Sequence, residues 1–140
     1  MTNDGENGRG GEVLQLRIVI EAEDYDDAVR FYRDVLGLRE QEAYEGEGGA
    51  RVAILDAGRA TLELANPAQK RFIDSVEAEG RPSPRVRLAF EVPDAEVATE
   101  RLAKAGAELV AEPRETPWRS LNSRLNAPAG MQVTLFEELD

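Results

Sequence analysis

One short pattern is written twice in this chain, seventy positions apart. Residues 17–24 read RIVIEAED and residues 87–94 read RLAFEVPD. Each copy begins with an arginine, alternates apolar with other side chains, and ends on an aspartate that can cap a helix. Because a solenoid needs three or more repeats, two copies predict a pseudo-symmetric pair of identical supersecondary units.

Both copies have the period of a strand with one buried face. In the first, every second residue from 14 to 22 is apolar, and Arg17 and Glu21 fall on the opposite face. In the second, Arg87 and Glu91 lie opposite the apolar residues in the same way. The alternation therefore predicts that the arginines and glutamates leave the core and share a second, functional or solvated face.

After each of these strands, the spacing predicts one helix and then three further strands. Asp24 and Asp94 stand at the caps, and Gly37 and Gly106 supply left-handed stops. The expected elements are a strand at 13–22, a helix at 24–36, strands at 38–44, 51–55 and 60–65, then a strand at 85–92, a helix at 94–105, and strands at 108–111, 121–125 and 131–136. The order is β-α-β-β-β, twice.

A short helix joins the two halves. Asn66 is its cap, Pro67 its first residue, and Gly80 its end, before the proline-rich stretch RPSPR. The organisation predicted is a disordered tail at 1–11 and a single domain at 12–140. That domain comprises module one at 12–65, a linker at 66–84 and module two at 85–138.

The composition of the chain limits which partners it can bind and which chemistry its side chains can support. The 140 residues carry a net charge of −11, which disfavours nucleic acid and anionic membranes and favours cationic or neutral ligands at long range. No cysteine and no histidine are present, so thiolate chemistry and the commonest metal ligand are excluded. The chain has neither a bilayer-spanning apolar run nor a secretion segment, so we expect no membrane partner and a cytoplasmic location.

Three stretches resemble the vicinal oxygen chelate superfamily, which includes glyoxalase I, extradiol dioxygenases, and fosfomycin- and bleomycin-resistance proteins. They are DYDDAVRFYRDVLGL at 24–38, GRATLELA at 58–65 and PWRSLNSRLNAPAGMQVTLFEE at 117–138. The resemblance covers about residues 13–138. It implies an α+β fold in which two tandem β-α-β-β-β modules form a cupped mixed sheet, and it implies a homodimer.

The resemblance also locates the superfamily's metal site. The two positions that relatives fill with histidine are Arg17 and Arg87 here, and the carboxylate position in the last strand is Thr134. Only Glu63 matches a carboxylate that some members use. One oxygen ligand does not hold a transition metal against water, so we expect no metal and no other cofactor.

The expected ligand-binding residues share the face turned away from the core or lie at the rim of the cup. They are Arg17, Glu63, Arg87 and Thr134, with Glu21 and Glu91 beside the arginines and Trp118 in the loop before a strand of module two. Trp118 could stack on a planar ligand or anchor an interface or core.

Three interpretations of the charged residues Arg17, Arg87 and Glu63 stay open. The arginines could grip an anionic or carbonyl-rich ligand bidentately, with Glu63 and Thr134 setting its orientation. Arg17, Arg87 and Glu63 could instead be a salt-bridge cluster that fixes the modules without a ligand. Glu63 could also be a general base, although the pKa that burial raises is lowered again by two arginines.

The leading function is metal-independent binding of a small organic molecule, an antibiotic or metabolite, in the manner of bleomycin-resistance proteins. One alternative is a glyoxalase-like lyase or isomerase, or a dioxygenase, with an unorthodox site around Glu63. Another is a degenerate dimer retained for its structure. The acidic surface favours a cationic ligand, whereas the inward arginines favour an anionic or carbonyl-rich one, so the charge of the ligand stays open. The sequence also leaves open whether the modules pair within one chain or between two chains.

Overall fold

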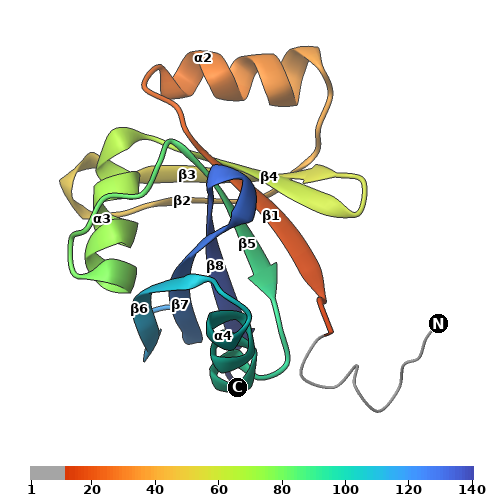
Figure 1. The fold of residues 1–140 in the computed structure, drawn as a ribbon. Coiled ribbons are helices and arrows are strands. Elements are labelled where there is room, and N and C mark those ends of the chain that lie inside the picture. Colours follow the sequence, from red (N-terminus) through yellow and green to blue (C-terminus); the bar gives the residue numbers. More distant parts are fainter. Residues whose placement is uncertain (1–11) are drawn as a thin grey trace. The chain divides into compact units, whose positions relative to one another are not determined.

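The computed structural model describes residues 12–140 (Figure 1); the tail predicted at 1–11 lies outside them. The described chain divides into two compact units. The first unit comprises residues 17–87, and the second comprises residues 88–140 with residues 12–16. Each unit combines helices with strands of a sheet, which confirms the predicted α+β class.

The elements follow the predicted order β-α-β-β-β twice. From the start of the described chain they are β1 (Gln15–Glu21), α2 (Tyr25–Val29), the π-helical segment η1 (Arg30–Val35), β2 (Glu40–Glu45), the 3-10 turn η2 (Glu47–Gly49), β3 (Arg51–Ala57), β4 (Ala60–Ala65) and α3 (Pro67–Ala78). They continue as β5 (Val86–Glu91), α4 (Ala95–Lys104), β6 (Glu108–Glu115), β7 (Ser120–Ala127), the 3-10 turn η3 (Pro128–Gly130) and β8 (Met131–Glu138).

In the first unit the strands lie in the order β2-β3-β4-β1. The pairs β2–β3 and β3–β4 are antiparallel, and Ile54 of β3 is opposite Glu63 of β4. Helix α2 covers one face, where Tyr25 and Val29 pack with Leu55 and other residues of β3 and β4. Helix α3 contacts β3 and β4 from the other side, as Figure 1 shows.

In the second unit the order is β5-β8-β7-β6. Strand β5 is parallel to β8, and the pairs β8–β7 and β7–β6 are antiparallel. Helix α4 buries Ala95 and Ala98 against Leu125, Val133 and Leu135 of β7 and β8. The other face of these strands is therefore free of α4 and carries a different set of side chains.

The predicted helix starts are confirmed by their caps. The side chain of Asp24 accepts a hydrogen bond from the backbone N–H of Asp27 at 3.2 Å. Asp94 and Asn66 do the same for the third residue of α4 and of α3. Gly37, at φ +96°, follows the first helix in a conformation that favours glycine.

The helix that follows β1 departs from the prediction. Beyond Val29 the chain winds as a π-helix, and the N–H of Leu36 donates to the carbonyl of Phe31, five residues earlier, at 2.8 Å. The spacing of an α-helix over 24–36 predicts that Val35 and Leu36 lie on its apolar, packed face, but this is wrong, because they are 62% and 60% exposed. That expectation rested on a repeat of 3.6 residues, which a π-helix does not have.

Some predicted boundaries and packing residues also change. The stretch EPRETPW was expected to connect strands, but β6 continues through Pro113 to Glu115. The edge position of β6 and two irregularities in its pairing allow a proline there. Phe72 and Val97, expected on the apolar faces of their helices, are 44% and 47% exposed.

Candidate functional site

The sheet face opposite α2 in the first unit carries three of the predicted site residues, Arg17, Glu21 and Glu63. Strand β1 places Arg17, Val19 and Glu21 at alternate positions, and β4 contributes Glu63. On the same face, three buried apolar side chains form a cluster: Val52, Ile54 and Ala65. Charged groups and buried apolar side chains are thus combined on one side of the sheet.

Arg17 and Glu63 form the first ion pair of this face. Arg17 Nη1 lies 4.0 Å from Glu63 Oε1, and their side chains are 28% and 15% exposed. Burial raises the pKa of Glu63, and the nearby Arg87 and Arg17 lower it without cancelling that effect. The expectation that the arginines hold this pKa down is therefore corrected: removal from water outweighs them.

Arg87 forms an ion pair with a residue of a helix, and this contact was not predicted from the sequence. Its Nη1 lies 4.0 Å from Oε1 of Glu77 on α3, and the two side chains are 8% and 3% exposed. The residue spacing contained a signal, because positions 70, 73, 74 and 77 form one stripe of a helix. Three of these four positions carry charged side chains, Lys70, Asp74 and Glu77.

A small hollow lies between α3 and the charged strand face. It is lined on the strand side by Val19, Glu63 and Arg87 and on the helix side by Ile73 and Lys70. The volume of this hollow is enough for about one water molecule. Three basic side chains (Lys70, Arg85, Arg87) and three acidic ones (Glu21, Glu63, Asp74) contribute to its wall, so the charges are balanced.

Two further ion pairs are formed by side chains that line this hollow. Lys70 Nζ lies 2.9 Å from Asp74 Oδ2 along α3, and Arg85 Nε lies 4.0 Å from Glu21 Oε1. Glu21 of β1, Glu63 of β4 and Arg87 of β5 are thus brought together in the lining of this hollow.

The raised pKa of Glu63 predicts how stability varies with pH. The folded state holds this proton more tightly than the unfolded chain, so stability falls as the pH rises from the ordinary value of 4.5 through the raised pKa. Glu63→Gln removes the titrating group. The melting temperature of the variant minus that of the wild type is therefore expected to increase over this range in thermal scans between pH 4 and pH 9. A difference that falls with pH would contradict the direction of the shift.

The remaining predicted residues belong to the second unit. Thr134 is 1% exposed on β8, where its neighbours across the strands are Arg124 and Ala89. Glu91 lies on β5 opposite Phe136. Trp118 is 43% exposed in the turn between β6 and β7, which agrees with its predicted loop position.

A polar strand face in the second unit was also missed. Arg124 is fully buried on β7, and its Nη1 donates to Oε1 of Gln132 on β8 at 3.4 Å. Gln132 in turn donates to Asn126 at 3.1 Å. Every second residue of SLNSRLNA, from Ser120 to Asn126, is polar and was visible in the sequence. The strand at 121–125 was predicted, but the buried polar face of this strand was not.

The residues at the superfamily's metal positions do not fit a metal. Arg17 and Arg87 carry guanidinium groups, which keep their protons in proteins and have no lone pair to donate. Thr134 offers a hydroxyl and Glu63 a single carboxylate. Within residues 12–140, no three acidic side chains gather into a possible ion site. No step of a reaction at this face is therefore assigned to a metal.

Comparison with known proteins decides the family. A family model described as a glyoxalase-like domain matches residues 17–136. The chain belongs to this family of glyoxalase-like domains. The predicted resemblance to the vicinal oxygen chelate superfamily is thereby confirmed. No curated protein matches the sequence of this glyoxalase-like chain.

Solved structures show the same fold as this glyoxalase-like chain. A hypothetical protein from Bacillus halodurans C-125 is 19% identical with a TM-score of 0.68, over 91% of this chain and 94% of the other. Methylmalonyl-CoA epimerase from Mycobacterium tuberculosis is 25% identical with a TM-score of 0.61, over 91% and 88%. A glyoxalase/bleomycin resistance protein/dioxygenase superfamily member from Vibrio splendidus 12B01 is 16% identical with a TM-score of 0.61, over 89% and 99%.

Within the described part of the chain, every helix is too short or too polar to cross a bilayer.

Proposed function

We propose that this glyoxalase-like protein binds a small organic molecule without a metal, at the sheet face that carries Arg17 and Glu63. The observation that carries the proposal is the pairing of these side chains at 4.0 Å on a face with a buried apolar cluster. Ligand sites commonly combine apolar walls with a few placed polar groups. Arg17 retains 28% of its side-chain exposure, so it is open to a ligand.

The chemistry of Arg17 supports recognition in preference to scaffolding. A guanidinium offers a planar fork of donors that matches a carboxylate or carbonyl group. At 4.0 Å its contact with Glu63 is longer than a good charged hydrogen bond, which is about 2.7–2.9 Å. We propose that a bound molecule takes a place beside this pair and accepts hydrogen bonds from Arg17.

A specific variant tests the proposal. Small organic molecules, antibiotics and metabolites included, are screened by thermal shift, and each hit is measured by calorimetry. Arg17→Ala is expected to weaken binding at least about tenfold, because charged hydrogen bonds contribute about 1.5–3 kcal/mol. Arg30→Ala, which removes an exposed arginine paired with Asp27 on the helix side, is the matched control and is expected to bind normally.

Two results would contradict this assignment. If Arg17→Ala binds every hit as tightly as the wild type, the site lies elsewhere. If no molecule shifts the melting temperature and Arg17→Ala only destabilises the fold, the ion pairs are structural, as in a degenerate dimer. Stoichiometric zinc, iron or manganese that survives dialysis would separately refute metal independence.

A second function is favoured by one observation, the raised pKa of Glu63. A carboxylate that holds its proton more tightly is a stronger base once ionised, which suits a metal-free lyase or isomerase. The similar methylmalonyl-CoA epimerase is an isomerase by its name. Turnover of a bound hit that is lost in Glu63→Gln, with binding retained, would select this function over simple binding.

The cellular setting of this function is also proposed. We propose a cytoplasmic homodimer that does not bind nucleic acid, because the net charge of −11 opposes contact with a phosphate backbone. Sedimentation of the purified protein tests the dimer directly.

A further inference from the structure

Helix α3 lies over the same sheet face that carries Glu63. Its side chains Lys70 and Ile73 line one wall of the small hollow, and Val19 of β1 and Glu63 of β4 line the opposite wall. Because this hollow has a volume for about one water molecule, an organic molecule does not fit into it while α3 is in place. Such a molecule therefore reaches the α3 side of Glu63 only if the helix moves.

The residues at 70, 73, 74 and 77 form the inner stripe of α3, which is unusually polar for a packed helix. The buried residues of this helix are two apolar ones and two carboxylates: Ile73, Ala78, Asp74 and Glu77. Asp74 pairs with Lys70 at 2.9 Å, and Glu77 lies 4.0 Å from Arg87 of the sheet. A helix that is fixed on a core normally presents an apolar stripe instead.

Ion pairs hold a helix on a sheet less firmly than apolar side chains do. Burying two opposite charges gains their attraction but costs their hydration, and the two terms roughly cancel. When the helix lifts, these charges recover their hydration, whereas an apolar stripe would be exposed to water at a cost that grows with its area. The polar stripe therefore lowers the free energy that lifting α3 requires, and elements that open at low cost are those that serve as lids.

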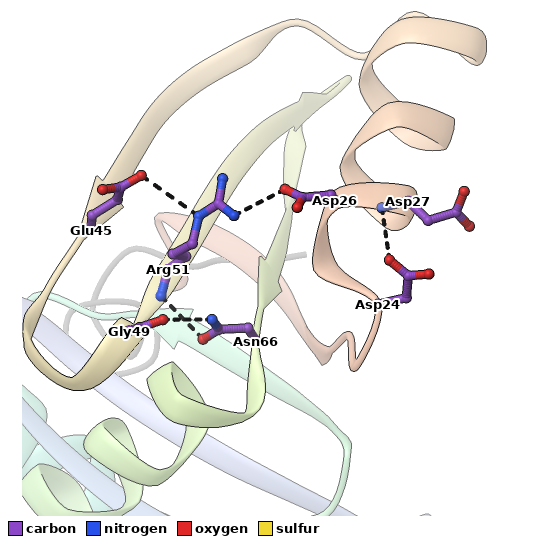
Figure 2. A network of polar contacts seen from close by, with 7 residues as sticks. All are labelled: Asp24, Asp26, Asp27, Glu45, Gly49, Arg51 and Asn66. Carbon is purple, nitrogen blue, oxygen red and sulfur yellow. Dashed lines mark hydrogen bonds and ion pairs between the residues drawn. The ribbon is translucent and has the colours of Figure 1, made fainter.

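Helix α3 is attached differently at its two ends. At the start, the Asn66 side chain accepts a hydrogen bond from the backbone N–H of Arg51 at 3.1 Å and donates one to the carbonyl of Gly49 at 2.8 Å, as Figure 2 shows. At the other end the chain turns through Glu79 at φ +56°, a strained conformation for a residue other than glycine. Residues 79–85 then form neither helix nor strand before β5 begins. The start of α3 is thus suited to be a hinge, and its end to move.

We propose that α3 is a lid, which swings about its start at Asn66 and uncovers Glu63 and Arg87 so that a ligand can enter. This inference rests on the proposed binding function and deepens it by naming the element that controls access to the site. The closed lid keeps water from Glu63, and the open lid supplies the room that the hollow lacks. Because the open form is the minor one, the apparent affinity for a ligand is reduced by the fraction that is open.

Native-state thiol labelling tests the lid, because the chain contains no cysteine and one introduced thiol reports on one place. Ala78→Cys places it at the end of α3 farthest from the hinge, and Ala53→Cys places it in the core beneath α2; these alanines are 0% and 1% exposed. Each labelling rate is divided by that of the same variant when unfolded. The thiol of Ala78→Cys is expected to react at least about a hundredfold faster, and with a weaker dependence on urea, because opening α3 exposes less surface than unfolding does. Ile73→Cys is the second reporter if Ala78→Cys does not fold.

The contribution of the polar stripe is measured in the same assay. Lys70→Met/Asp74→Leu replaces an ion pair of the stripe with apolar side chains and is expected to slow the labelling of Ala78→Cys at least about tenfold. Arg30→Met/Asp27→Leu, which replaces an exposed ion pair on the helix side of the sheet, is the matched control and is expected to leave that rate unchanged.

Two results would refute the lid. The first is labelling of Ala78→Cys at the rate and with the urea dependence of Ala53→Cys, since α3 would then open only when the whole fold does. The second is labelling that Lys70→Met/Asp74→Leu does not slow. No ligand enters either measurement, so the two proposals fail separately. A hit that depends on Arg17 while α3 stays closed refutes the lid alone, and an opening α3 in a protein that binds no molecule refutes the binding function alone.

Discussion

Glu77→Leu is expected to lower the free energy of unfolding by about 3–5 kcal/mol, because it breaks a buried ion pair by removing the carboxylate that lies 4.0 Å from the guanidinium of Arg87. Both side chains are almost inaccessible, at 8% and 3% exposed, so water cannot replace the lost partner without opening the helix. Denaturation by urea at neutral pH measures the change. Arg71→Leu, at an exposed position of the same helix, is the control and is expected to change stability by under about 0.5 kcal/mol.

The double variant Arg87→Met/Glu77→Leu is expected to be more stable than Glu77→Leu alone. Replacing a whole buried ion pair with apolar side chains of similar volume is often neutral or stabilising by about 1–4 kcal/mol, because both charges no longer need to leave water. We therefore expect the double variant to recover the stability lost in Glu77→Leu. A double variant as unstable as the sum of its parts would show that the pair itself holds α3 in place.

Leu55→Ala and Leu125→Ala are each expected to cost about 2–5 kcal/mol and to lower the melting temperature by about 10 °C. Both leucines are 0% exposed, the first in the core beneath α2 and the second in the core beneath α4. They form a matched pair, one in each compact unit. Calorimetry and near-ultraviolet circular dichroism follow the transitions, and Val97→Ala, at an exposed position of α4, is the mild control.

This pair of variants also tests the predicted single domain at 12–140. If the chain unfolds as one domain, both substitutions shift one common transition to lower temperature. If Leu125→Ala instead moves one transition and leaves a second unchanged, the two units unfold independently and the single-domain prediction is wrong.

The fold was predictable because its signals are local and repeated. Alternation in RIVIEAED and RLAFEVPD indicated which side of each strand faces a helix, and aspartate caps with terminal glycines marked the helix ends. The same alternation placed Arg17 and Glu63 on one face, where they pair at 4.0 Å. Such features depend on neighbours within a few residues, so one sequence is enough to locate them.

The missed parts of the site depend on what a side chain meets across space. Helix α3 was interpreted through its apolar residues, yet its inner stripe buries Asp74 and Glu77, because cations lie opposite. Arg124 was hidden for the same reason, since a charged residue in a strand normally indicates a solvated face. The direction of the Glu63 pKa required the balance between burial and two arginines, which residue spacing cannot supply.

The π-helical segment η1 explains a mismatch in length between the two modules. From the capping aspartate to the terminating glycine there are thirteen positions in the first module, Asp24 to Gly37, and twelve in the second, Asp94 to Gly106. One residue added to an α-helix rotates everything after it by about 100°. The wider π turn at Arg30–Val35 takes up such an added residue, so the cap and the glycine keep their roles. The two halves of this protein can thus diverge by single insertions without losing the common plan they share.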